Sequence, residues 1–157
     1  MKNFTNFFVS LGFIGYIKVI PGTIGSLISI LFLFPIFSYN ILSKNLFFLI
    51  FISLIFLSYF FIGLYSKNTN THDSKKIIID EFIGIFLIFL FYDIILILND
   101  ITTLILIFII FRFFDILKIF PADLIDRKIR NPAGVILDDI VAAIYTIIVL
   151  FLFHEII

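Results

Sequence analysis

The stretch LFFLIFISLIFLSYFFIGLY, residues 46–65, has no charged side chain anywhere along its length. A helix needs about 20 apolar residues to cross the hydrocarbon core of a bilayer. Only helices and closed β-barrels satisfy all their backbone hydrogen bonds in lipid, and the strands of a barrel alternate polar and apolar residues. Because this run is apolar throughout, it predicts a membrane-spanning helix.

The composition of the whole chain supports the same conclusion. Of its 157 residues, 62% are hydrophobic and 14% are charged. A soluble domain is about half apolar and about a quarter charged, and it needs that polar surface to face water. We therefore predict one helical membrane domain over residues 1–157. The net charge of zero gives no reason to expect a nucleic-acid partner.

Four other apolar runs predict further spans. The expected fold is all-α: a polytopic helical integral membrane protein with about four to five apolar helices. Residues 1–18 carry Lys2 and Lys18 around an apolar stretch and are expected to form an interfacial or re-entrant segment. The predicted spans are Thr23–Tyr39, Leu46–Tyr65, Ile77–Leu98 with Asp93 inside it, Ile101–Phe114 and Val135–Ile157.

The basic residues predict the orientation of these spans. If the N-terminus is cytoplasmic, every Lys and Arg except Lys44 falls on the cytoplasmic side. Such a bias is typical of cytoplasmic loops. Most of the acidic residues fall on that side too, although the positive-inside rule does not govern carboxylates. Their convergence indicates a functional site at the cytoplasmic face.

Two short motifs open predicted spans at that face. In PGTIGS, residues 21–26, the glycines permit close backbone approach, and Thr23 or Ser26 can cap the following helix, whose N-terminal amides attract anions. An ordinary Pro-Gly turn is the alternative. In IIIDEFIG, residues 77–84, Asp80 and Glu81 gain from the helix dipole, but carboxylates near apolar depth are costly and usually functional.

The third motif is the stretch RFFDILKIFPADLIDRKIRNPAGVILDD, residues 112–139. Arg112, Asp115 and Lys118 recur every three residues, so they share roughly one helix face. Asp138 and Asp139 open the last span. Mg²⁺ takes oxygen ligands from carboxylates and substrate phosphate, and Arg and Lys suit the remaining phosphate oxygens. The mixture favours a metal–phosphate site over a structural salt-bridge network.

Absent residue types narrow the chemistry further. The chain has no cysteine, which excludes disulfide and thiol chemistry, and only two histidines, His72 and His154. These histidines lie far apart along the chain, which argues against a zinc site.

Four motifs, PGTIGS, IIIDEFIG, FRFFDILKIFP with DLIDR, and GVILDDIVAAIY, together resemble the phosphatidylglycerophosphatase A family in their order and spacing. The resemblance runs from about Phe13 to Tyr145. It implies a small multi-pass enzyme of the bacterial inner membrane. Such an enzyme uses Mg²⁺ to remove the terminal phosphate of phosphatidylglycerophosphate, which leaves phosphatidylglycerol.

The resemblance also implies roles for individual residues, with Asp126 carried over as a further polar position. An Asp would orient the attacking water or form an aspartyl-phosphate, and the sequence leaves both open. Ile119, Pro132–Ala133 and Ala143 depart from the family pattern, but they affect backbone shape only. The expected sets are catalytic Asp115, Asp139 and Arg112; phosphate-binding Thr23, Ser26, Arg112, Lys118 and Arg127; and metal-binding Asp80, Glu81, Asp115, Asp138 and Asp139.

Two other functions compete with this one. A CDP-alcohol-type lipid phosphotransferase also uses clustered aspartates, and Gly134 with Asp138 matches part of its signature. However, its next acid would fall at Ala142. A non-enzymatic transporter would place its charges across the bilayer, whereas most charges here gather on one face.

Overall fold

A computed structural model describes residues 2–71 and 74–156, and the described chain is helical without any strand. The predicted all-α class is thus confirmed. His72 and Asp73, and Ile157 at the end of the fifth predicted span, lie outside the described residues. The elements are α1 Lys2–Val9, the 3₁₀ turn η1 Ile14–Tyr16, α2 Pro21–Ser38, α3 Lys44–Thr69, α4 Ile79–Leu90, α5 Tyr92–Ile95, α6 Asp100–Leu117, α7 Ala122–Lys128 and α8 Pro132–Ile156.

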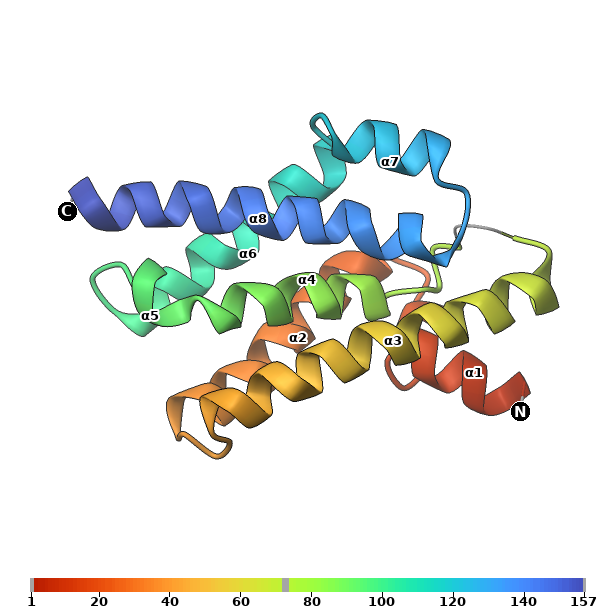
Figure 1. Cartoon of the computed structure of the whole chain (residues 1–157), viewed down its shortest axis with the longest axis horizontal. Helices are drawn as coiled ribbons and strands as arrows, with labels where there is room; N and C mark the ends of the chain where they lie inside the picture. The colour runs from red at the N-terminus through yellow and green to blue at the C-terminus, as the bar shows by residue number, and fades with distance from the viewer. Residues whose placement is uncertain (1, 72–73, 157) are drawn as a thin grey trace.

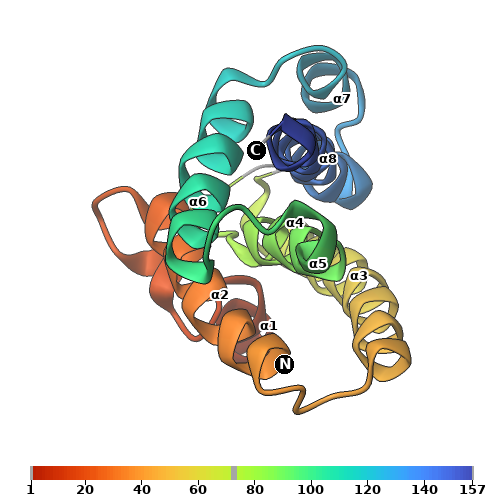
Figure 2. The same cartoon turned by 90° about the vertical axis from the view of Figure 1, so that its left-hand side faces the viewer.

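Helix α4 lies at the centre of the bundle, between α2, α3 and α8 (Figure 2). Its Ile83, Ile85, Ile88 and Phe89 are fully buried. At Gly84 the helix comes so close to its neighbours that an added Cβ would lie 2.8 Å from the Phe111 ring and 3.1 Å from a backbone oxygen of α8. The absence of a side chain at Gly84 therefore sets how closely α4, α6 and α8 approach.

Three helices, α2, α3 and α8, are long and apolar enough to cross a membrane by length and composition. Their outer faces stay apolar: on α3, Phe56 is 72% exposed and Phe60 is 55% exposed. A soluble protein rarely leaves so many large apolar side chains on its surface. The exposed apolar faces fit lipid as the surrounding solvent.

The third predicted span is not one continuous helix. The chain turns at Phe91, so the predicted segment Ile77–Leu98 forms α4 and the short α5. Polar contacts hold this turn: the Tyr92 hydroxyl donates to Asp100, and Lys44 forms an ion pair with Asp93. With 12 residues, α4 is only about 18 Å long, which is too short to span the hydrocarbon alone.

The fourth predicted span is longer than expected. Helix α6 continues to Leu117, beyond the predicted end at Phe114, so Asp115 lies in the same helix as Arg112 instead of in the following loop. The two side chains form an ion pair, and this pairing offsets the cost of placing both charges on an otherwise apolar helix.

The N-terminal segment is a short helix that lies along α3 (Figure 1). With eight residues, α1 cannot cross a bilayer. Phe4 and Phe8 both contact the Phe61 ring, and the carbonyl of Val9 accepts a hydrogen bond of 3.0 Å from the amide of Ile78. The segment thus supports the residues that lead into α4. Its interfacial position stays a prediction.

The loops between the long helices fall at two opposite ends of the bundle (Figure 1). The first turn of α4 and the α7–α8 loop lie at one end, here called the polar end. The α2–α3 and α5–α6 connections lie at the other.

Cysteine labelling tests the predicted orientation, because the chain has no native cysteine. Thr71→Cys and Arg130→Cys, both exposed at the polar end, should react with a membrane-impermeant maleimide only from the cytoplasm. Asn40→Cys at the opposite end should react only from outside. Labelling of Thr71→Cys from outside intact cells would show that the orientation is opposite to the predicted one.

Candidate active site

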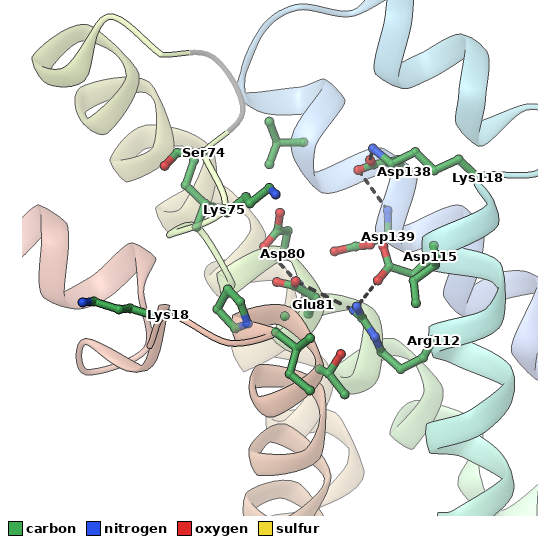
Figure 3. A pocket seen from close by; sticks show the side chains of 17 residues that line it. Lys18, Ser74, Lys75, Asp80, Glu81, Arg112, Asp115, Lys118, Asp138 and Asp139 are labelled. Carbon is green, nitrogen blue, oxygen red and sulfur yellow. Dashed lines mark hydrogen bonds and ion pairs between the residues drawn. The ribbon is translucent and has the colours of Figure 1, made fainter. Parts of the chain in front are cut away.

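A pocket of about 480 Å³ opens at the polar end, where the start of α2, the start of α4, the end of α6 and the start of α8 meet (Figure 3). Four segments far apart in the sequence thus contribute to one cavity. Eight of the predicted site residues line it together: Thr23, Asp80, Glu81, Arg112, Asp115, Lys118, Asp138 and Asp139.

Three carboxylates form the centre of the pocket. Asp80 and Glu81 lie in the first turn of α4, and Asp139 projects from α8. One oxygen from each lies within 4.8 Å of the others. Asp80 is 8% exposed and Asp139 is 3% exposed, so water contributes little to their solvation. Such an arrangement of buried oxygens is suited to a hard divalent cation.

A buried atom supports this assignment. Among the residues that the structure describes, Glu81 Oε2 has no hydrogen-bond partner although it is buried. A buried oxygen without a partner is costly unless something else binds it. The other two predicted metal ligands, Asp115 and Asp138, line the same pocket but are each ion-paired with a basic side chain.

Arg112 lies against this cluster from the α6 side. Its Nη1 donates to Asp115 and lies 3.9 Å from Glu81 Oε1. Its Nε is buried and has no acceptor within the described chain. The guanidinium therefore has a donor available beyond its pairing with Asp115.

Lys118 lies on the opposite side of the pocket from the start of α2. Its Nζ lies 2.7 Å from both Asp126 and Asp138. Burial alone would lower the pKa of its ammonium, but the hydrogen bonds to these two carboxylates outweigh burial and raise that pKa above its usual range. Lys118 ends α6 with a left-handed φ of 43°, which is uncommon for a residue with a side chain and turns the chain towards α7.

The PGTIGS motif forms the start of α2 rather than a capped loop. The helix begins at Pro21, and no side chain caps its first turn, so the prediction that Thr23 or Ser26 caps it is wrong. Proline suits the first helical position because it has no amide hydrogen to satisfy. Instead, the Ser26 hydroxyl donates to the Gly22 carbonyl at 2.9 Å.

Gly22 allows this start of α2 to approach the charged cluster. A Cβ at this position would overlap the Glu81 carboxylate and lie 3.3 Å from Arg112 Nη1. The glycine is therefore part of the wall that fixes both side chains.

Asn131 performs the capping function at the start of α8. Its side-chain oxygen accepts from the amides of Ala133 at 2.9 Å and Gly134 at 3.2 Å. Pro132 occupies the first position of α8, which proline tolerates. The Pro132–Ala133 departure from the family pattern thus fits a regular helix start, two turns before Asp139.

Three predicted polar positions do not line the pocket. Ser26 is fully buried behind Arg112, with 3.5 Å between its Oγ and Nη1. Arg127 has a side chain that is 73% exposed, and it pairs with Asp123 instead. Asp126 reaches the site only through Lys118.

Three polar residues of the pocket lining were not predicted as site residues: Lys18, Ser74 and Lys75. Figure 3 shows Lys75 pointing towards the interior of the pocket and Lys18 near its edge. Each lies a few residues before a motif, which was a usable signal. The two lysines were not assigned to the site because the predicted orientation already explains basic residues at a membrane face.

The fold and the pocket define a class: a helical membrane protein whose polar end holds a buried carboxylate cluster surrounded by basic side chains. The sequence profile of the Phosphatidylglycerophosphatase A family matches residues 7–154. The chain belongs to this family.

One curated relative, Phosphatidylglycerophosphatase A of Haemophilus influenzae, is 35% identical over 85 residues, which are 51% of this chain and 47% of the relative. The matched stretch therefore spans about half the length of that relative. No solved structure matches the chain.

Gly22→Ala tests how tightly the wall fits. The added methyl group should displace Glu81 and Arg112, and so reduce any rise in melting temperature that Mg²⁺ induces in the unmodified protein. Gly63→Ala is the matched control, since its Cβ would meet Pro132 at an ordinary 3.4 Å. Equal Mg²⁺ responses in the two variants would show that Gly22 does not shape the site.

Proposed function

We propose that this protein is a Mg²⁺-dependent lipid phosphatase that hydrolyses the terminal phosphate monoester of phosphatidylglycerophosphate to phosphatidylglycerol and phosphate. It would act at the cytoplasmic face of the bacterial inner membrane. One observation carries the proposal: a buried carboxylate trio, Arg112 and Lys118 share one pocket at the polar end of an apolar bundle. Family membership supports the same reaction.

The metal would be held by Asp80, Glu81 and Asp139. Their oxygens are near one another, and the unpartnered Glu81 Oε2 supplies an atom that the described chain leaves unsatisfied. When bound, Mg²⁺ would offset negative charge on the phosphoryl oxygens.

The basic side chains would bind the phosphate. Arg112 has its Nε available for a phosphoryl oxygen while Nη1 stays with Asp115. Lys118 stays protonated between Asp126 and Asp138, so it presents a fixed positive charge. Donors placed in advance where charge develops lower the barrier of phosphoryl transfer. Thr23, at the open start of α2, would add a hydroxyl and nearby helix amides.

An aspartate would complete the reaction. Asp115 and Asp138 both line the pocket outside the carboxylate trio, and each is oriented by a cation. Either would orient the attacking water, and an aspartyl-phosphate route remains the alternative. We propose Asp115 for this role, because the same Arg112 that orients it would also bind the substrate.

Lys75 would interact with the second phosphate of the lipid. Phosphatidylglycerophosphate carries a phosphodiester one glycerol unit away from its terminal phosphate. Lys75 lines the pocket and points inwards, and no residue of the described chain forms an ion pair with it (Figure 3).

The CDP-alcohol phosphotransferase is not favoured. The acid that follows Asp138 in its signature would fall at Ala142, which is buried in the core one turn after Asp138. No carboxylate can act from that position.

Asp139→Asn should abolish Mg²⁺-dependent phosphate release from phosphatidylglycerophosphate, because the amide keeps the shape but loses the anionic oxygen that binds a hard cation. Asp93→Asn, at the opposite end of the bundle, is the matched control and should retain activity. Full activity of folded Asp139→Asn protein in excess chelator would rule out the metal assignment.

Arg112→Lys should fold and keep its pairing with Asp115, yet lose the planar donor group that suits phosphate. The expected loss is about 2–4 kcal/mol of transition-state stabilisation, or roughly a hundredfold in turnover at saturating lipid.

Arg127→Lys makes the same chemical change outside the pocket and should leave turnover near that of the unmodified protein. A near-normal Arg112→Lys enzyme would return Arg112 to a purely structural role as the partner of Asp115.

A further inference from the structure

A second hollow at the polar end, of about 630 Å³, lies between the last turns of α3 and the loop that leads into α8. We call it the α3–α8 groove. No described residue lines both this groove and the active-site pocket. Gly63 of α3 and Pro132 of α8 meet at its floor, where a Cβ on Gly63 would lie 3.4 Å from the proline ring.

The groove has two chemically different walls. Tyr59, Phe60 and Leu64 form an apolar wall on the membrane-spanning part of α3. Lys67 and Arg130 lie on the polar wall, together with the hydroxyl and amide groups of neighbouring residues. Phe60 and Lys67 are seven residues apart, so the walls are separated by about 10 Å along the helix axis.

The two cations of the groove have no counter-charge among the described residues. Across residues 2–71 and 74–156, neither Lys67 nor Arg130 forms an ion pair, and the described groove lining contains no carboxylate. Arg112 and Lys118 of the active-site pocket, by contrast, are both paired with aspartates. The groove therefore has a net positive wall directly above an apolar one.

We infer that the α3–α8 groove binds an anionic phospholipid, separately from the active site. The headgroup phosphate would lie between Lys67 and Arg130, and an acyl chain would pack along Phe60 and Leu64. A soluble anion would leave the aromatic wall uncovered. A zwitterionic lipid would bring its own ammonium group towards two cations. Only an anionic lipid satisfies both walls.

A lipid bound in the groove would also contact the start of α8. Asn131, which caps that helix, lines the groove, and Asp138 and Asp139 follow about two turns later. The lipid would thus bind to a helix that builds the active site without entering it.

A single tryptophan tests the inference, because the chain contains none. Phe60→Trp places a fluorophore in the groove of the full-length protein. The variant is reconstituted in bilayers whose lipids carry brominated acyl chains, which quench the tryptophan fluorescence on contact. Brominated phosphatidylserine should quench with an apparent association constant about fivefold or more above that of brominated phosphatidylcholine, since each cation near a membrane surface favours anionic lipid. Raising the salt concentration should reduce the preference.

Matched variants locate the effect. In the Phe60→Trp protein, the double substitution Lys67→Gln and Arg130→Gln should bring the ratio of the two association constants to about one. Lys128→Gln, which removes an exposed cation outside the groove, should leave that ratio unchanged. Phe56→Trp, on the exposed face of α3 outside the groove, should show no preference. Equal quenching by both lipids at Phe60→Trp would overturn the inference. So would displacement of the lipid by millimolar inorganic phosphate, which would indicate a simple phosphate site.

Discussion

The close crossing of α4, α6 and α8 at Gly84 is the constraint on which the site depends. It brings the first turn of α4 beside α8, so that Asp80, Glu81 and Asp139 are buried together. Burying one carboxylate costs several kcal/mol unless a cation or hydrogen bonds offset it, and burying three side by side costs more. A cation bound by the three oxygens would offset this cost.

The surrounding cations are arranged in two layers with different consequences. Arg112 and Lys118 each pair with an aspartate, which fixes their positions before any substrate arrives. Lys75 lies further out and makes no ion pair within the described chain. Fixed inner charges suit the stabilisation of a developing anion, whereas an outer cation without an ion-pair partner suits attraction of an anionic lipid.

Lipid as solvent explains why the polar chemistry gathers at one end. Apolar faces of α2, α3 and α8 must stay outward, so polar side chains find partners only inside the bundle or at its ends. At the opposite end, the described residues form separate polar contacts such as Lys44 with Asp93 and Tyr92 with Asp100. The proposed reaction has the same requirement, because its substrate presents a phosphate at the membrane surface.

The sequence by itself determined the helical membrane class and most of the polar residues that line the pocket. Apolar run length and the absence of charge are local properties, and the motifs supplied Asp80, Glu81, Arg112, Asp115 and Asp139. Only the tertiary structure decided how these residues divide between a carboxylate cluster and ion pairs, because that depends on the angles at which four segments meet.

The same reason explains the other differences. Arg127 points to solvent because α7 turns it away, Ser26 lies behind Arg112 because α2 begins at Pro21, and the third span breaks at Phe91 because polar contacts from other helices hold the turn. Ser26 and Asp93 contact partners far away in sequence, Arg112 and Lys44, which no local pattern contains. Arg127 differs, because its partner Asp123 lies within the same helix.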